Sequence, residues 1–102
     1  MFDRVGSIPL DSPACDMMQS DPADLDPGEL WATSPRGADY LFGEPITRAF
    51  NHINGLKLII RSKTMLMNGH MYWHGDRLLS LYSCPDYGHR NNNTGSVVSF
   101  DA

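Results

Sequence analysis

Apolar residues with a helical spacing mark one segment near the middle of the chain. The segment GEPITRAFNHIN, residues 43–54, has apolar side chains at intervals of three and four, which places them on one face of a helix. These side chains are Ile46, Ala49, Phe50 and Ile53. Pro45 suits the first turn of a helix, and Gly55 suits the position directly after its end. We therefore predict a helix over residues 43–54 with one apolar face.

A shorter apolar pattern follows this helix. Residues 56–61, LKLIIR, form a run rich in branched side chains after a glycine, which predicts a buried strand. Three later segments are further strand candidates, at 69–74, 78–83 and 96–100, and Gly75-Asp76 supplies a turn between the first two. A helix followed by strands that are neighbours in sequence predicts an α/β fold with a largely local sheet.

The first part of the chain lacks such periodicity. Residues 2–5, FDRV, suggest a short turn of helix, and prolines punctuate the loop that follows. Residues 14–18 form only a brief apolar segment. The acidic segment SDPADLDPGEL, residues 20–30, contains two prolines and a glycine, so we predict a surface loop there rather than a metal cage.

Composition places the chain in the soluble globular class, with 102 residues, 41% hydrophobic and 20% charged. The net charge of −4, with eight scattered Lys and Arg, argues against nucleic acid as a partner. The first residues carry charge and no long apolar run, so neither a secretory signal nor a membrane span is predicted. Cys15 and Cys84 are far apart and outside any zinc-type spacing. We expect a cytoplasmic location, with the nucleus as an alternative.

Four histidines raise the question of a metal site. His70 and His74 would share one face of a strand, but at a separation of about 13 Å they cannot share one ion, which favours surface or strand-pairing histidines. His52 lies off the apolar face of the predicted helix and should be solvated. His89 follows a strand end in a polar loop, where sites are often built, although an ordinary loop histidine is the alternative.

Arg36 is the clearest candidate for anion binding. The sequence Ser34-Pro35-Arg36-Gly37 places a planar guanidinium on a rigid turn, from which it can make two parallel hydrogen bonds to a phosphate or a carboxylate. The alternative is an ordinary surface arginine.

Several short motifs in a fixed order resemble the C-terminal part of the PPP family of serine/threonine protein phosphatases. They are SDP (20–22), SPRGADYLFG (34–43), FNHINGLKLI (50–59), RSK (61–63) and SCPDYG (83–88), with DR (3–4), PACD (13–16) and SFD (99–101) at the two ends. The resemblance is closest to the type 2A group, especially the protein phosphatase 6 branch. It implies that residues 1–102 form the C-terminal portion of a metallophosphoesterase-type (calcineurin-like) αββα sandwich with a mixed sheet.

The resemblance also implies roles for particular residues. In the intact family, two divalent ions such as Mn, Fe or Zn activate a water that hydrolyses phosphoserine or phosphothreonine. Arg36 matches the phosphate-binding arginine, and Tyr87 matches the tyrosine of a loop that overhangs the catalytic centre. Lys63 stands where the family has a metal-ligating histidine. A protonated ammonium has no lone pair to offer a cation, so Lys63 should not bind metal unless burial removes its proton.

Other departures from the family point the same way. The family's upstream metal-binding motifs have no counterpart in the 102 residues, and the loop at 83–93 lacks both family cysteines. We therefore expect no cofactor for this chain and no hydrolysis by it alone. The expected partners are a phosphoprotein or a regulatory or scaffold subunit of a phosphatase.

Two alternatives to an enzyme stay open. One is a non-catalytic module that binds a phosphopeptide or a phosphatase subunit through Arg36, Arg61 and Lys63. The other is a truncated gene product with no selected function. In each case part of a sandwich should expose apolar surface, which predicts self-association or the need for a partner.

Overall fold

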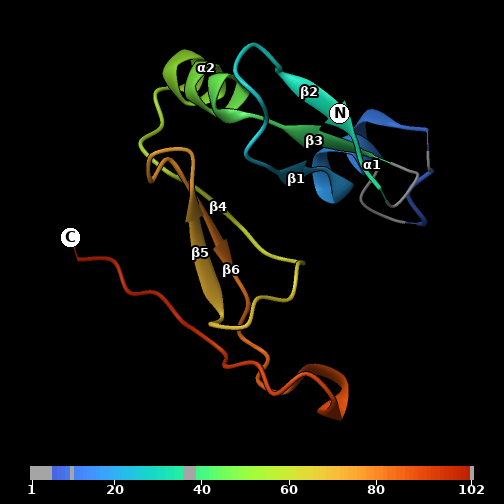
Figure 1. Cartoon of the computed structure of the whole chain (residues 1–102), viewed down its shortest axis with the longest axis vertical. Helices are drawn as coiled ribbons and strands as arrows, with labels where there is room; N and C mark the ends of the chain where they lie inside the picture. The colour runs from blue at the N-terminus through green and yellow to red at the C-terminus, as the bar shows by residue number, and fades with distance from the viewer. Residues whose placement is uncertain (1–5, 10, 36–38, 102) are drawn as a thin grey trace. The chain divides into compact units, whose positions relative to one another are not determined.

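The structure is a computed structural model that describes residues 6–9, 11–35 and 39–101. The chain divides into two compact units, Met1–Ile46 and Thr47–Ala102, and each is described by itself. Figure 1 shows the helices and strands of both units. The predicted turn of helix at residues 2–5 lies outside the described residues.

The first unit begins with a helix that the sequence pattern did not predict. Helix α1 covers Pro13–Gln19, where only a brief apolar segment was expected. Ser12 caps it, because its hydroxyl accepts a hydrogen bond from the Cys15 amide at 3.2 Å. Proline at the first helical position and an N-cap serine are the local signals that define this start.

A small mixed sheet completes the first unit. Strands β1 (Asp21–Pro22), β2 (Trp31–Thr33) and β3 (Tyr40–Phe42) lie in the order β1-β3-β2. β1 runs parallel to β3, and β2 runs antiparallel to it. The predicted loop at 20–30 is therefore correct only after β1, because Asp21–Pro22 pairs with β3.

Helix α2, Glu44–Asn54, confirms the predicted helix, but not the predicted packing of its apolar face. The buried side chains are the polar Thr47 and Asn51. Phe50 and Ile53 are 52% and 79% exposed. The buried face is polar because Thr47 and Asn51 find hydrogen-bond partners in the turn between β5 and β6.

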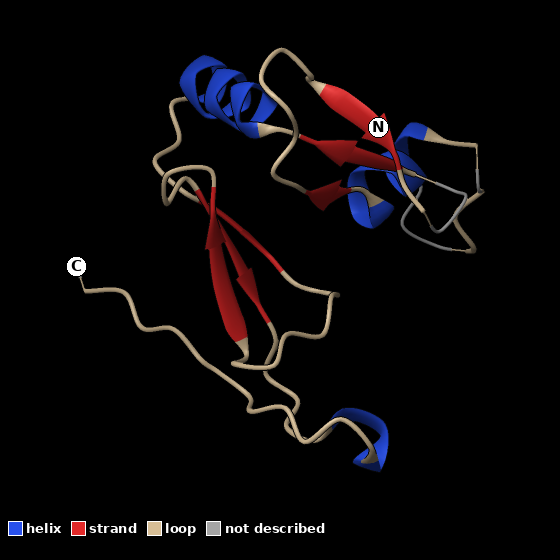
Figure 2. Cartoon of the chain, in the orientation of Figure 1, coloured by secondary structure: helices blue, strands red, loops and turns tan. Residues whose placement is uncertain are grey.

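The second unit contains another mixed sheet, made of β4 (Ile59–Arg61), β5 (His70–Trp73) and β6 (Leu78–Leu81). The order is β4-β6-β5, with β4 parallel and β5 antiparallel to β6 (Figure 2). The hairpin turn around Gly75 is as predicted. The strands are shorter than predicted, and β4 is not buried as expected, because it lies at the edge of the sheet with Ile60 exposed.

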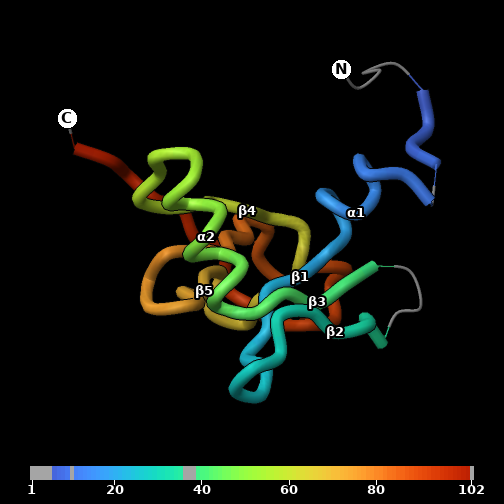
Figure 3. The backbone as a smooth tube through the Cα atoms, turned by 90° about the horizontal axis from the view of Figure 1, so that it is seen from above, coloured from blue at the N-terminus to red at the C-terminus, as the bar shows by residue number. Residues whose placement is uncertain are grey.

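The predicted strand at 96–100 is wrong. The Ser96 amide donates to the Tyr82 carbonyl at 3.0 Å, which continues the line of β6 for one hydrogen bond. After that bond the C-terminal segment runs as an extended chain with no strand assigned, and Val97 is 86% exposed (Figure 3). Alternating apolar residues favour a strand, but the described part of the chain forms no ladder for them to join.

Exposed apolar surface is extensive, as predicted. Among the described residues the buried hydrophobic side chains are those of Cys15, Leu78 and Leu79. Many large apolar side chains are exposed, and those of the second unit include Phe50, Ile53, Leu56, Ile60, Met67, Met71, Tyr72, Val97 and Phe100. In the described part of the chain, no helix has both the length and the apolar character needed to cross a membrane.

Candidate functional site

Lys63 lies two residues after the end of β4, at the position where the resemblance expects a metal-ligating histidine. Its backbone has a φ of 94°, an uncommon left-handed value for a residue with a side chain. The side chain is exposed. Lys63 is therefore not in the buried surroundings in which a lysine can act as a neutral ligand.

The described residues do not fit a metal centre of the PPP type. Among them, no three His, Cys, Asp or Glu side chains gather closely enough to hold a metal ion. His70 and His74 also fail to share a strand face, since β5 ends at Trp73. His74 instead begins the hairpin turn with a φ of 55° and is buried, so its predicted role as a surface or strand-pairing residue is wrong.

His74 and Thr47 form a buried polar contact that the sequence did not predict. The Thr47 hydroxyl lies 2.7 Å from the His74 Nδ1 atom. One helical turn further on, Asn51 donates its side-chain amide to the Arg77 carbonyl at 3.2 Å. The i, i+4 spacing of Thr47 and Asn51 is the one sequence signal for this polar face, and their partners lie in the turn that follows β5.

Tyr87, the residue that the resemblance matches to a tyrosine near the catalytic centre, lies in the loop after β6. It begins the short 3-10 helix η1, Tyr87–His89, and its side chain is half exposed. Its ring meets the Tyr82 ring edge to face, with centroids 5.7 Å apart. A half-exposed phenol held against a second ring can contact a ligand without much freedom to move.

Asn93 is buried beneath this loop and was not singled out from the sequence. Its Oδ1 atom accepts a hydrogen bond from the Tyr87 amide at 2.8 Å. Its Nδ2 atom donates to the carbonyls of Cys84 at 2.8 Å and Thr94 at 3.3 Å. The Asn93 carbonyl also accepts from the Asp86 amide at 2.8 Å. One side chain therefore joins both ends of the loop.

The electrostatics of the loop are distinctive at Tyr82. Partial burial raises the pKa of the Tyr82 phenol, and the neighbouring Tyr87 phenol and Cys84 thiol raise it further. Each of these effects disfavours the phenolate. The Tyr82 ring is therefore neutral wherever the loop is folded at ordinary pH.

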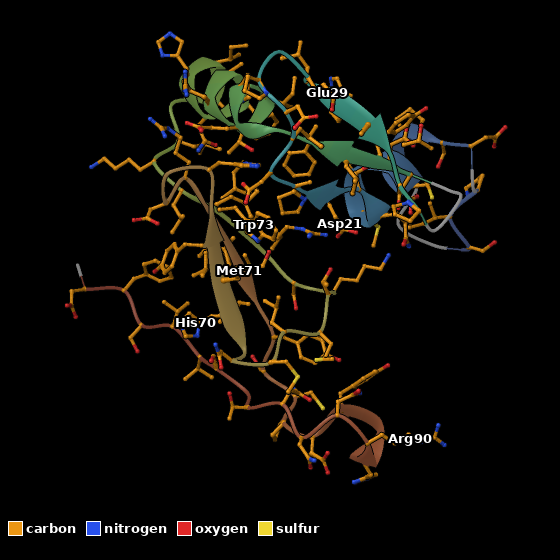
Figure 4. All side chains as sticks on the ribbon, in the orientation of Figure 1. Asp21, Glu29, His70, Met71, Trp73 and Arg90 are labelled. Carbon is orange, nitrogen blue, oxygen red and sulfur yellow. The ribbon has the colours of Figure 1, made fainter. Side chains whose placement is uncertain are left out.

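The basic residues of the loop project into solvent. His89 is fully exposed, and its Nδ1 atom lies 3.8 Å from the Asp86 carboxylate, a charge pair that exists only when the imidazole is protonated. Arg90 points away from the end of the loop (Figure 4). The loop therefore presents exposed basic side chains in the same short segment as Tyr87.

The predicted phosphate-binding Arg36 lies outside the described residues. Of its described neighbours, Ser34 is buried, and the Ser34 amide donates to the Asp39 carbonyl at 3.1 Å. Arg61 is the last residue of β4, opposite Ser80 of β6. Arg61 and Lys63 therefore both lie at the C-terminal end of β4.

No family model matches the sequence. The structure is similar to that of a serine/threonine protein phosphatase from Saccharomyces cerevisiae that has similarity to human phosphatase PP5. The match has a TM-score of 0.80 and 29% sequence identity, and it covers 92% of this chain.

This similarity defines the class of fold. The chain has a mixed α/β fold with mixed sheets that matches part of a PPP-type, calcineurin-like phosphatase, as the sequence predicted. It spans 28% of the length of the yeast phosphatase. The similarity is to a PPP-family phosphatase in general and does not distinguish the branches within that family.

Proposed function

We propose that this chain is part of a serine/threonine protein phosphatase of the type 2A group, closest to the protein phosphatase 6 branch. In this proposal the chain supplies the phosphate side of the site, with Arg36 as the phosphate-binding residue and Tyr87 as a substrate-contacting residue. The supporting observation is the similarity to the yeast phosphatase, which extends over 92% of the chain. The substrate class is phosphoserine or phosphothreonine in a protein.

We further propose that these 102 residues do not hydrolyse phosphoesters by themselves. Lys63 cannot donate a lone pair while it is protonated, and the described residues hold no group of metal-binding side chains. The chain therefore needs ligands from other residues, or it acts without catalysis. Its proposed partners are a phosphoprotein or a regulatory or scaffold subunit of a phosphatase, in the cytoplasm or the nucleus.

The experiment is a phosphatase assay of the purified chain with a phosphothreonine peptide and manganese, beside calorimetric titration of manganese into the protein. We expect neither turnover nor stoichiometric metal uptake. Turnover that follows metal occupancy would contradict the proposal, because it would require a metal centre built from residues that we interpret as surface. A Lys63→Ala variant is the matched control for any metal-dependent signal.

A non-catalytic phosphopeptide-binding module is the second candidate. It is favoured by the exposed Lys63 and by the ordered loop that presents Tyr87. In this function the ammonium supplies positive charge at a position where the family has a metal ligand. Calorimetric titration with a phosphothreonine peptide should then show binding that weakens in Lys63→Ala and Arg36→Ala. Equal binding by the parent and both variants would exclude this candidate.

A further inference from the structure

We propose that Asn93 is a positioning residue, whose buried amide holds the loop at residues 84–94 in the conformation that presents Tyr87. Asn93 is only 3% exposed, so it acts on a ligand through Tyr87 and not by direct contact. The inference rests on the proposed function for its link to phosphopeptide, and on the geometry of the loop for everything else.

The Asn93 side chain makes hydrogen bonds with three backbone groups. Its oxygen accepts from the Tyr87 amide, and its nitrogen donates to the carbonyls of Cys84 and Thr94. Only a side chain with both an acceptor and a donor pair can make these contacts. Aspartate would keep the acceptor and place negative charge beside two carbonyl oxygens, and alanine would lose every contact.

The loop needs such an anchor because its backbone is unusual. Asp86, His89 and Asn92 all have left-handed φ values, of 45°, 54° and 51°. This region is uncommon for residues with side chains, and although Asp, His and Asn adopt it more readily than others, three such residues in one loop still need contacts that hold them there. The side chains of Asp86 and Asn91 make further hydrogen bonds. The Asp86 carboxylate accepts from the backbone amide of Asn92, and the side-chain amide of Asn91 donates to the Tyr87 carbonyl. Both of these bonds lie on the outside of the loop, whereas Asn93 lies within it.

The consequence for Tyr87 is preorganisation. Its amide is bonded to Asn93, its carbonyl is bonded to Asn91, and its ring packs on Tyr82, while half of the side chain faces solvent. A ligand that meets Tyr87 therefore has little loop entropy to remove on binding. Loss of the Asn93 contacts should free the loop, whereas the sheet β4-β6-β5 should keep its backbone hydrogen bonds.

The test compares Asn93→Ala, Asn93→Asp and the control Asn91→Ala in the whole chain, by hydrogen exchange of individual amides. Asn91 is exposed, and its side chain donates one hydrogen bond to the Tyr87 carbonyl, not to the Tyr87 amide. We expect exchange of the Tyr87 amide to accelerate by about 5–10-fold in Asn93→Ala, the equivalent of one hydrogen bond, and to change little in Asn91→Ala. Amides of β6 should keep their protection.

Two results would overturn the inference. Unchanged exchange at Tyr87 in Asn93→Ala would show that the amide is held by something else. An equal acceleration at Tyr87 and in β6 would show that Asn93 stabilises the whole unit and does not position the loop. Asn93→Asp keeps the acceptor for the Tyr87 amide but loses both donors and places a carboxylate against the Cys84 and Thr94 carbonyls, so it should also accelerate exchange in the loop.

Binding of a phosphothreonine peptide separates this inference from the proposed function. If the parent binds the peptide, Asn93→Ala should bind it several-fold more weakly, and the uncharged variant Asn91→Ala, which loses one exposed hydrogen bond to the Tyr87 carbonyl, should lose much less affinity. Equal binding by Asn93→Ala, despite a freed Tyr87 amide, would overturn the link between loop order and ligand. If the parent does not bind, the proposed function fails, and the exchange data alone decide whether Asn93 positions Tyr87.

Discussion

At the scale of single residues, the contact between Thr47 and His74 ties helix α2 to the turn after β5, because both side chains are buried and 2.7 Å separates their polar atoms. We expect Thr47→Val to destabilise the fold by about 1–3 kcal/mol, since valine keeps the shape and leaves a buried imidazole nitrogen without this partner. Urea unfolding followed by circular dichroism measures the change. Thr33→Val, at an exposed position of β2, is the control, and an equal loss there would contradict the argument.

The raised pKa of Tyr82 predicts how stability changes in alkali. The folded state holds the phenol proton more tightly than the unfolded chain, so this contribution is fully present below the ordinary tyrosine pKa and is lost as the pH rises through the raised value. We expect unfolding midpoints in urea to fall as the pH rises above about 10, the ordinary pKa of tyrosine. Tyr82→Phe should flatten that fall, and Tyr72→Phe, at an exposed position on β5, should not. A parent midpoint that stays level over this range would count against the prediction.

Some of the residues at the candidate site could be identified from the sequence, and others could not. Lys63 and Tyr87 could be singled out because they stand inside short motifs with a fixed order. The buried contacts of Asn93 and His74 could not be predicted, because they depend on how the chain folds around these side chains. A buried polar residue has no periodic signature of its own, so its partners must be seen in space.

At the scale of elements, the loop of Tyr87 is closed by a tight backbone approach at Gly95. A Cβ atom on Gly95 would lie 2.4 Å from the Ser83 carbonyl oxygen, which belongs to the backbone and cannot swing aside. We therefore expect Gly95→Ala to cost about 1–3 kcal/mol of stability, the usual range for overpacking. Thermal unfolding measures this cost. Gly43→Ala is the matched control, because its Cβ would come no closer than 3.2 Å to the nearest atom, and a similar loss in both would refute the steric argument.

The elements themselves were predictable where a pattern is long enough. Helix α2 follows from four apolar positions at helical spacing, but its buried face does not, because the partners of Thr47 and Asn51 are 27 and 26 residues away. Strands β2 and β3 are three residues each, too short to show alternation. The segment at 96–100 shows the opposite error, since its residues favour a strand and the described chain offers them no partner.

At the scale of the whole molecule, the fold class was within reach of the sequence because the resemblance extends over nearly the whole chain. The structure adds that the sheets are small and that few hydrophobic side chains among the described residues are fully buried. A chain that spans 28% of the yeast phosphatase has correspondingly little interior of its own. Its behaviour in solution should therefore depend on what covers its apolar side chains.

Helix α2 offers the sharpest test of that dependence, because Phe50 and Ile53 are 52% and 79% exposed. Burying one such side chain in an interface contributes about 1.5–3 kcal/mol, so the double variant Phe50→Glu, Ile53→Lys should weaken self-association by at least about tenfold. Sedimentation velocity over a range of concentrations measures it, with a hydrophobic dye as the second readout. The control carries the same charges on exposed polar residues of the same helix, His52→Glu and Asn54→Lys, and should associate like the parent. A parent that stays monomeric and binds no dye would show that this face of α2 needs no partner. The inference that a partner covers the chain would then rest on the fold comparison alone.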